Sequence, residues 1–418
     1  MTDILSFGCR LNALEGEAIR AHLAGLPAAR QDIVVVNTCA VTAEAERQAR
    51  QAIRRAARER PGVPIVVTGC AAQIAPSRWA ALPGVTRVLG NTEKLDPAAW
   101  RSAAAIAVGD IMAAPRIAAS PVTAFAGRAR AFLQIQQGCD HRCTFCTIPL
   151  GRGNSRSVPP DDILAQARAL LAAGHHEIIL TGVDLTSYGA DLPAPASLGA
   201  IAARLLAETD LPRLRLSSLD PAELDDDFWA LLETNPRLMP SLHLSLQSAS
   251  DLILKRMKRR HSRAQAEAVI ARARALRPDI AIGADLIAGF PTETDALFAQ
   301  TLDFVTTHAI PYLHVFPYSE RPDTPAARMP AVPVPVRRDR ARLLREAAGR
   351  NAAAYHARFL GRTVTVLAEA DGTGRGEHGT RVRIDAAPAH AAGSGTLARL
   401  RVTAADADGL TATSLAAA

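Results

Sequence analysis

Short apolar runs alternate with polar, helix-like stretches through the first hundred residues of the chain. Residues 3–9, 32–39 and 63–70 have the length and composition of buried strands. Each of these runs ends in a cysteine: Cys9, Cys39 and Cys70. Because parallel strands bring their carboxyl ends to one edge of a sheet, the pattern predicts an open α/β domain with all three cysteines along that edge.

The same alternation returns near residue 130 and repeats six times. Strands are predicted at 131–139, 177–184, 214–220, 241–248, 280–290 and 312–319, with helices between them, for example at 161–174 and 263–276. Six βα units over about 220 residues predict a parallel barrel, either whole or partial.

Changes in composition divide the chain. Residues 106–128 lose the pattern and are typical of a linker with a weak strand, whereas four prolines from Pro325 to Pro335 close the barrel region ahead of a helix near 337–359. The last residues carry short apolar runs separated by Gly and Asp, which predict a small all-β domain. We therefore expect an N-terminal domain at 1–105, a linker at 106–128, a barrel with a trailing helix at 129–358 and the β domain at 359–418.

Composition indicates the cellular location of the protein and the kind of partner that it binds. The chain is 48% hydrophobic, but no apolar run reaches membrane-spanning length and the first residues lack the features of a signal peptide. We expect a cytoplasmic protein with no membrane partner, where cysteines serve metals or chemistry more often than disulfides. The net charge of +7 suits a nucleic-acid partner. However, arginine supplies nearly all of the positive charge, only three lysines are present and alanine is abundant. A GC-rich coding bias would produce the same composition, so the net charge alone is weak evidence for a nucleic-acid partner.

Three of the six cysteines lie within eight positions, as Cys139, Cys143 and Cys146. Structural zinc takes four ligands, yet no fourth cysteine is near and His141 is poorly placed between two of the three. A four-iron cluster that only carries electrons also takes four protein ligands. Three ligands leave one metal position open for a substrate, which indicates a catalytic site just after the first barrel strand.

The C-x3-C-x2-C spacing, with Phe145 before the last cysteine, resembles the radical S-adenosylmethionine (SAM) enzymes. The resemblance implies a four-iron cluster on Cys139, Cys143 and Cys146, with SAM bound at the open iron through its amino and carboxylate groups. It also implies cleavage of SAM to a 5′-deoxyadenosyl radical that abstracts hydrogen from the substrate.

The segments around Cys9, Cys39 and Cys70 are similar to the N-terminal domain of the methylthiotransferases of that superfamily. The similarity implies a second four-iron cluster, so that all six cysteines are used; three buried apolar cysteines are the structural alternative. The last sixty residues resemble the family's RNA-binding TRAM domain. Four further segments resemble the family's barrel: 180–189, 244–261, 284–294 and 316–326.

Three branches of this family act on isopentenyladenosine in tRNA, on threonylcarbamoyladenosine in tRNA, or on an aspartate of a ribosomal protein. Residues 8–19 and 182–189 most resemble the threonylcarbamoyladenosine branch. This implies methylthiolation at C2 of adenosine-37 in tRNA, with an electron donor of the flavodoxin or ferredoxin type and a sulfur source as partners. The chain departs from the family at Asp323, where glycine is usual, and in a short TRAM region.

The resemblance and the strand ends together predict cofactor-binding residues: Phe145, Gly182, Asp184, Ser218, Gln247, Arg259, Asp285 and Gly289. Each has a structural alternative, because an aromatic ring fills space, a glycine ends a strand and a buried polar group needs a partner in any case. Arg259 could instead contact an RNA phosphate, and Ser218 and Gln247 could contact the substrate.

The β domain offers arginines on two strands. Arg381 and Arg383 share one strand face, as do Arg399 and Arg401, and this arrangement suits phosphate binding. Two other classes of protein remain as alternatives. A non-catalytic RNA-binding protein with structural zinc is one, and an iron–sulfur electron carrier is the other, although the carrier leaves the β domain and the open iron unexplained.

Overall fold

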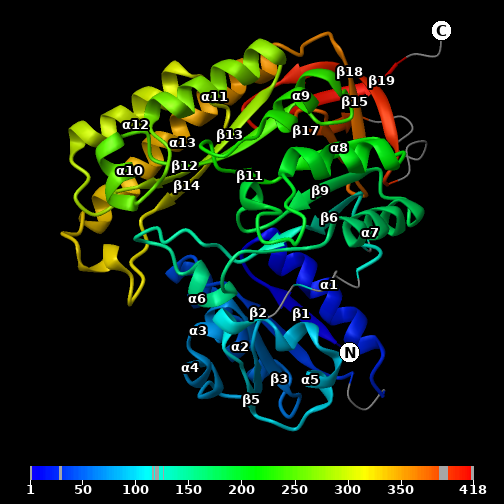
Figure 1. The fold of residues 1–418 in the computed structure, drawn as a ribbon, viewed down its shortest axis with the longest axis vertical. Helices are drawn as coiled ribbons and strands as arrows, with labels where there is room; N and C mark the ends of the chain where they lie inside the picture. The colour runs from blue at the N-terminus through cyan, green and yellow to red at the C-terminus, as the bar shows by residue number, and fades with distance from the viewer. Residues whose placement is uncertain are drawn as a thin grey trace.

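The computed structural model describes residues 2–27, 31–114, 117, 122–125, 127–385 and 394–415. Parts of the predicted linker, at 115–116, 118–121 and 126, lie outside these residues. In Figure 1 the chain runs from an N-terminal sheet (blue), through a large central body of parallel strands and helices (green to orange), to a small β barrel (red).

The N-terminal sheet has five parallel strands in chain order. They are β1 (Asp3–Ser6), β2 (Val34–Thr38), β3 (Ile65–Gly69), β4 (Val85–Leu89) and β5 (Ile106–Ala107). The helices between them are α1 (Arg10–Ala24), α2 (Ala43–Glu59), α3 (Cys70–Ile74), α4 (Pro76–Ala80) and α5 (Pro97–Arg101). The central strands β2 and β3 are buried at every position, which is why their sequences are nearly continuously apolar. β5 joins this sheet just beyond the domain end expected at residue 105.

All six predicted strands of the central body are present, in two parallel sheets of order β10-β9-β6 and β11-β12-β13-β14. Their bounds are β6 (Arg130–Gln134), β9 (Glu177–Thr181), β10 (Arg213–Leu216), β11 (Ser218–Leu219), β12 (Ser241–Gln247), β13 (Ala281–Ala288) and β14 (Tyr312–Pro317). β10 and β11 are one strand broken at Ser217, so they connect the two sheets. Among the described residues the outer strands β6 and β14 do not pair, and the barrel is therefore partial.

Side chains along each barrel strand alternate between the helices outside and the lumen inside. On β12, Leu242, Leu244 and Leu246 join the main hydrophobic core, whereas His243 and Gln247 face the other way and remain partly exposed. The surrounding helices are α7 (Pro160–Ala172), α8 (Leu198–Glu208), α9 (Asp226–Thr234), α10 (Asp251–Met257), α11 (Arg263–Leu276), α12 (Asp295–Thr307) and α13 (Val334–Ala357). This alternation gives the barrel a polar lumen.

The C-terminal strands form a closed barrel of order β15-β16-β17-β19-β18. They are β15 (Thr363–Ala368), β16 (Thr373–Gly376), β17 (Arg381–Asp385), β18 (Leu397–Ala405) and β19 (Leu410–Ser414). Buried arginines attach it to the central body, since Arg213 donates to Thr365 O at 2.6 Å and Arg215 to Glu377 O at 3.0 Å. No helix in the described part of the chain is long and apolar enough to cross a membrane.

Candidate active site with two cysteine sets

The loop at 138–147 carries three cysteines and begins where the first barrel strand ends, as predicted. A short antiparallel pair, β7 (Gln136–Gln137) and β8 (Arg156–Ser157), closes the base of the loop, and helix α6 (Ile148–Arg152) follows it. The amide of Cys139 donates to the carbonyl of Gly153 at 3.1 Å. The loop is thus held at the mouth of the barrel that is formed by the carboxyl ends of its strands.

All six cysteines lie in described residues and are free thiols. Burial, with smaller effects of Asp184 and of the other loop cysteines, raises the pKa of Cys139 well above its ordinary value. Burial, with a smaller effect of Cys143, likewise raises the pKa of Cys146 to about 12. Thiolates held this close repel one another unless a cation lies among them. A thiolate-ligated metal cluster supplies that cation, so this donor set fits a cluster.

Two charged residues from the predicted set approach these cysteines. Arg259 lies 3.8 Å from Cys143 Sγ, and it also donates to Asp220 Oδ2 at 2.7 Å. On the other side, Asp184 Oδ2 lies 3.7 Å from Cys139 Sγ. The loop is therefore flanked by a cation and by an anion, which are the partners that the carboxylate and amino groups of an amino acid require.

His141 is a further member of this site. Its Nε2 lies 3.1 Å from Asp184 Oδ2, and this contact raises the pKa of His141. The sequence interpretation considered His141 only as a poor zinc ligand. The carboxylate that holds it belongs to Asp184, 43 positions along the chain, and no local pattern signals such a pair.

Phe145 and Gly289 have structural contacts of their own. The ring of Phe145 packs edge-to-face on Phe290, with centroids 6.3 Å apart. Gly289 has a φ of +72°, and its amide donates to Glu293 Oε2 at 2.8 Å. These contacts are structural, and the predicted roles of both residues in cofactor binding remain predictions.

The backbone at Gly182 is held by a residue that the sequence interpretation missed. The side-chain oxygen of the fully buried Gln136 accepts from the amides of Val183 and Asp184, both at 2.9 Å. Gly182 and Asp184 were predicted to bind the cofactor, and in the structure the amides that follow Gly182 already donate to Gln136. At the end of β12, Gln247 has a φ of +65° next to a register shift, and such backbone strain re-aims side chains at functional sites.

Ser218 and Asp285 lie together inside the barrel with two histidines. Asp285 Oδ1 lies 2.9 Å from His243 Nε2 and 3.1 Å from His314 Nδ1, and Ser218 donates to Asp285 Oδ2 at 3.4 Å. Burial favours the neutral acid, but the hydrogen bonds from both histidines outweigh it and hold the pKa of Asp285 well below its usual range. We call these four residues the lumen cluster.

The N-terminal sheet carries the second cysteine set. Cys9, Cys39 and Cys70 follow the ends of three adjacent parallel strands, as predicted. Burial, and then the charge of Cys70, raises the pKa of Cys39 to about 12, so this set also favours a bound cation. Gly8 has a φ of +92°, and a Cβ there would lie 2.6 Å from Cys39 Sγ, so glycine is required where the chain passes this thiol.

A buried ion network lies behind the second set. Glu15 accepts from Lys94 Nζ at 2.6 Å and from Arg152 Nη1 at 2.8 Å, and all three side chains are at most 1% exposed. Burial favours the neutral acid, but the charges of Arg152 and Lys94 outweigh it and lower the pKa of Glu15 to about 2. Two cations and one carboxylate leave net positive charge beside Cys70, which suits a cluster made negative by thiolates.

The two cysteine sets lie on segments that pack together at the junction between the N-terminal sheet and the barrel. Helix α6 packs against α3, which begins at Cys70 (Figure 1). Thr147 Oγ1 donates to Ala40 O at 3.2 Å. This bond joins the residue after Cys146 to the residue after Cys39, so the segments that carry the two sets are in direct contact.

Comparison with known proteins agrees with this arrangement. Residues 133–305 match the Radical SAM superfamily, and residues 2–90 match the Uncharacterized protein family UPF0004. The threonylcarbamoyladenosine tRNA methylthiotransferase MtaB of Rickettsia prowazekii is 45% identical over 92% of this chain and 91% of its own. The chain belongs to this methylthiotransferase family. As a radical SAM methylthiotransferase it is a transferase that uses SAM and four-iron clusters.

Two further methylthiotransferases share less sequence with this chain. The enzyme of Bacillus subtilis with the same name is 37% identical over 78% of this chain and 74% of its own. The tRNA-2-methylthio-N(6)-dimethylallyladenosine synthase of Novosphingobium aromaticivorans is 36% identical over 90% and 87%. Among solved structures, the radical SAM methyltransferase TsrM of Kitasatospora setae shares the fold, with a TM-score of 0.56 and 14% identity over 74% of this methylthiotransferase and 68% of TsrM.

Proposed function

We propose that the protein installs a methylthio group at C2 of N6-threonylcarbamoyladenosine-37 in tRNA. The observation that carries this proposal is the meeting of two sets of three free cysteines across one junction, joined by the bond from Thr147 to Ala40. Methylthio transfer needs both a radical source and a sulfur-bearing site within reach of one base. The relatives from Rickettsia prowazekii and Bacillus subtilis support the choice of base.

We assign the residues as follows. Cys139, Cys143 and Cys146 hold the cluster that, together with SAM, supplies the radical for hydrogen abstraction at C2. Arg259 binds the carboxylate of SAM and Asp184 its amino group, because these two charges flank the loop. The remaining contacts to SAM come from Phe145, Gly182, Gln247 and Gly289.

Cys9, Cys39 and Cys70 hold the auxiliary cluster that carries the transferred sulfur. Cys9 is exposed while the other two are buried, so this set is accessible on the side of Cys9. Glu15, Lys94 and Arg152 keep the cysteine segments in place and add positive charge behind them.

We propose that the C-terminal barrel, from residue 359, binds tRNA. Arg383 and Arg401 are exposed on β17 and β18, and both strands pair with β19, where Arg383 lies opposite Thr411 and Arg401 opposite Thr413. The two arginines therefore lie on one face, where they suit phosphate contacts. The domain limits given above, a cytoplasmic location, a flavodoxin- or ferredoxin-like electron donor and a separate sulfur source complete the proposal.

Metal analysis and nucleoside analysis test this function. Protein reconstituted without oxygen should hold about eight irons per chain, as two four-iron clusters, and no zinc. With SAM, a reductant and tRNA that carries threonylcarbamoyladenosine, nuclease digestion and mass spectrometry should detect the 2-methylthio nucleoside. Zinc without iron would refute the radical chemistry, and methylthiolation of isopentenyladenosine alone would refute the substrate.

A further inference from the structure

Arg10 directly follows Cys9 and projects toward the barrel. It lies on the same face of α1 as Leu14 and Ala18, at spacings of four and eight residues. Both Leu14 and Ala18 pack in the hydrophobic core of the central body. Side chains of this helix face therefore point to the barrel, and Arg10 is the polar residue at its end.

Arg10 is exposed, and it lies near charged residues of the lumen. Its charge interacts with Arg130 on β6, Arg215 on β10 and Asp285 on β13. These strands come from both sheets of the partial barrel, so a group near all of them lies between the sheets. Arg10 keeps access to solvent while surrounding protein partly desolvates it, as expected for a side chain that lines an open cavity.

Arg10 is also without a partner, whereas its neighbours are paired. Arg130 lies 2.9 Å from Glu369, and Arg215 lies 3.1 Å from Glu177. Arg10 makes neither an ion pair nor a hydrogen bond with any residue that the structure describes. An unpaired arginine beside two other arginines favours an anionic ligand.

The net charge of the groups around the lumen also favours an anionic ligand. Four arginines are opposed by three carboxylates, which leaves one positive charge when the histidines are neutral. The groups are Arg10, Arg130, Arg213 and Arg215 against Glu177, Asp285 and Glu369. A single carboxylate from a ligand would balance them.

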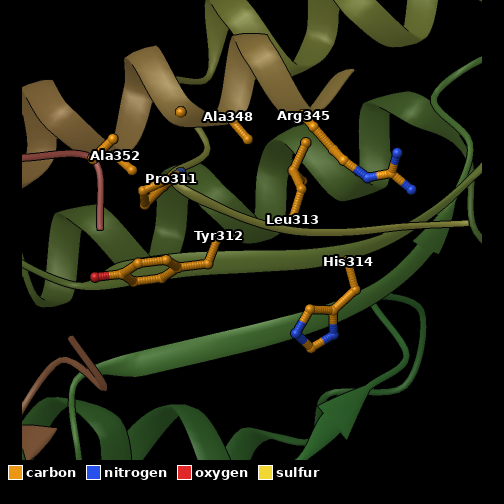
Figure 2. A pocket seen from close by; sticks show the side chains of 9 residues that line it. Pro311, Tyr312, Leu313, His314, Arg345, Ala348 and Ala352 are labelled. Carbon is orange, nitrogen blue, oxygen red and sulfur yellow. The ribbon is translucent and has the colours of Figure 1, made fainter. Parts of the chain in front are cut away.

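The lumen cluster supplies neutral hydrogen-bonding groups next to this charge. His314 extends from β14 on the side away from α13, whereas Leu313 points to that helix (Figure 2). The cluster lies close to the first cysteine set, because Ser218 is two residues from Asp220, the partner of Arg259. Polar groups of a substrate that reacts at the junction can therefore reach it.

We propose that Arg10 binds the carboxylate of the threonylcarbamoyl group and thereby determines the substrate, an inference that rests on the function proposed above. C2 and the N6 substituent flank the same ring nitrogen of adenine, so the substituent lies close to the reacting edge of the base. The lumen cluster then contacts the hydroxyl and urea groups of the substituent. An isopentenyl group carries no charge, so it offers Arg10 no anionic partner and gains no charge-assisted contact there.

The test compares two anticodon stem-loop RNAs that differ in one group. One carries threonylcarbamoyladenosine, and the other carries its primary carboxamide, which has the same shape without the charge. Binding is measured by fluorescence anisotropy, and methylthiolation by single-turnover assay. The wild-type protein should prefer the carboxylate RNA by roughly 10- to 100-fold, the range of a charge-assisted contact.

Arg10→Gln should bring this preference to within about threefold, and Arg10→Lys should restore part of it. Arg20→Gln, on the exposed face of the same helix, is the matched control and should behave as wild type. Iron content and the visible spectrum of each variant show whether the neighbouring Cys9 set is intact, and the binding assay does not require loaded clusters.

Two results would overturn the inference while the proposed function stands. They are equal use of both RNAs by the wild-type protein, and an equal loss of affinity for both RNAs in Arg10→Gln, which would identify a phosphate contact. If the wild-type protein modifies neither RNA but modifies isopentenyladenosine, the proposed function itself fails and the inference fails with it.

Discussion

Replacement of Glu15 by glutamine tests whether the buried ion network stabilises the N-terminal domain and its junction with the barrel. Glutamine keeps the size of the side chain and removes its charge, so Lys94 and Arg152 lose their common counterion at positions that are at most 1% exposed. Breaking a buried ion pair by removal of one partner typically costs about 3–5 kcal/mol. We expect a loss of this size in the free energy of unfolding.

The assay is denaturant unfolding of the metal-free protein, with hydrogen exchange to locate the loss. Exchange should increase in α1 and around Lys94 and Arg152, because these segments meet at Glu15. The control is Glu17→Gln on the same helix, where the partly exposed pair with Arg20 should contribute at most about 1 kcal/mol. Equal stability of the two variants would refute the reasoning.

The same network sets a pH dependence. The pKa of Glu15 is lowered from 4.5 to about 2, so the stabilisation from its charge is fully present above pH 4.5 and is lost as the pH falls toward 2. The difference in stability between the wild-type protein and Glu15→Gln should therefore shrink over this range. A difference that does not change with pH there would show that the effect of the substitution is steric.

Three further predictions follow from the site and the fold. Cys143→Ala should abolish SAM cleavage and leave about four irons per chain on the auxiliary set; 5′-deoxyadenosine formed at the wild-type rate would contradict the assignment. Arg383→Gln combined with Arg401→Gln should weaken tRNA binding and reduce the slope of log affinity against log salt concentration by about two, one for each lost phosphate contact. SAM cleavage without tRNA should be unchanged, and unaltered tRNA affinity would show that this face does not bind tRNA. Asp323 has a φ of +68° where the family often has glycine, so Asp323→Gly should raise the free energy of unfolding by about 1 kcal/mol in a denaturant titration, and a loss of stability would show that the aspartate side chain is needed.

The strands that sequence predicted are those with long apolar or alternating runs. β2, β3 and β12 are examples, because burial on one or both faces imposes a period that is visible along the chain. No prediction named β4 or β16. β4 is partly exposed at its first three positions, so its sequence is less apolar than those of β2 and β3. β16 (Thr-Gly-Arg-Gly) gains its strand conformation from pairing with β15 and β17.

The sequence by itself determined the parallel α/β class, the two cysteine sets and their places at strand ends, because these depend on local period and on spacing. Only the tertiary structure decided what surrounds those cysteines. Glu15 accepts from Arg152 across 137 positions, Gln136 accepts from the amides after Gly182, and Arg10 lies near charged residues of strands far along the chain. Such contacts join single polar residues from distant segments, and each residue's own neighbourhood in sequence is compatible with many partners. Glu15 and Gln136 are buried, so each needs a partner inside the protein, and the packing of distant segments decides which group lies within reach.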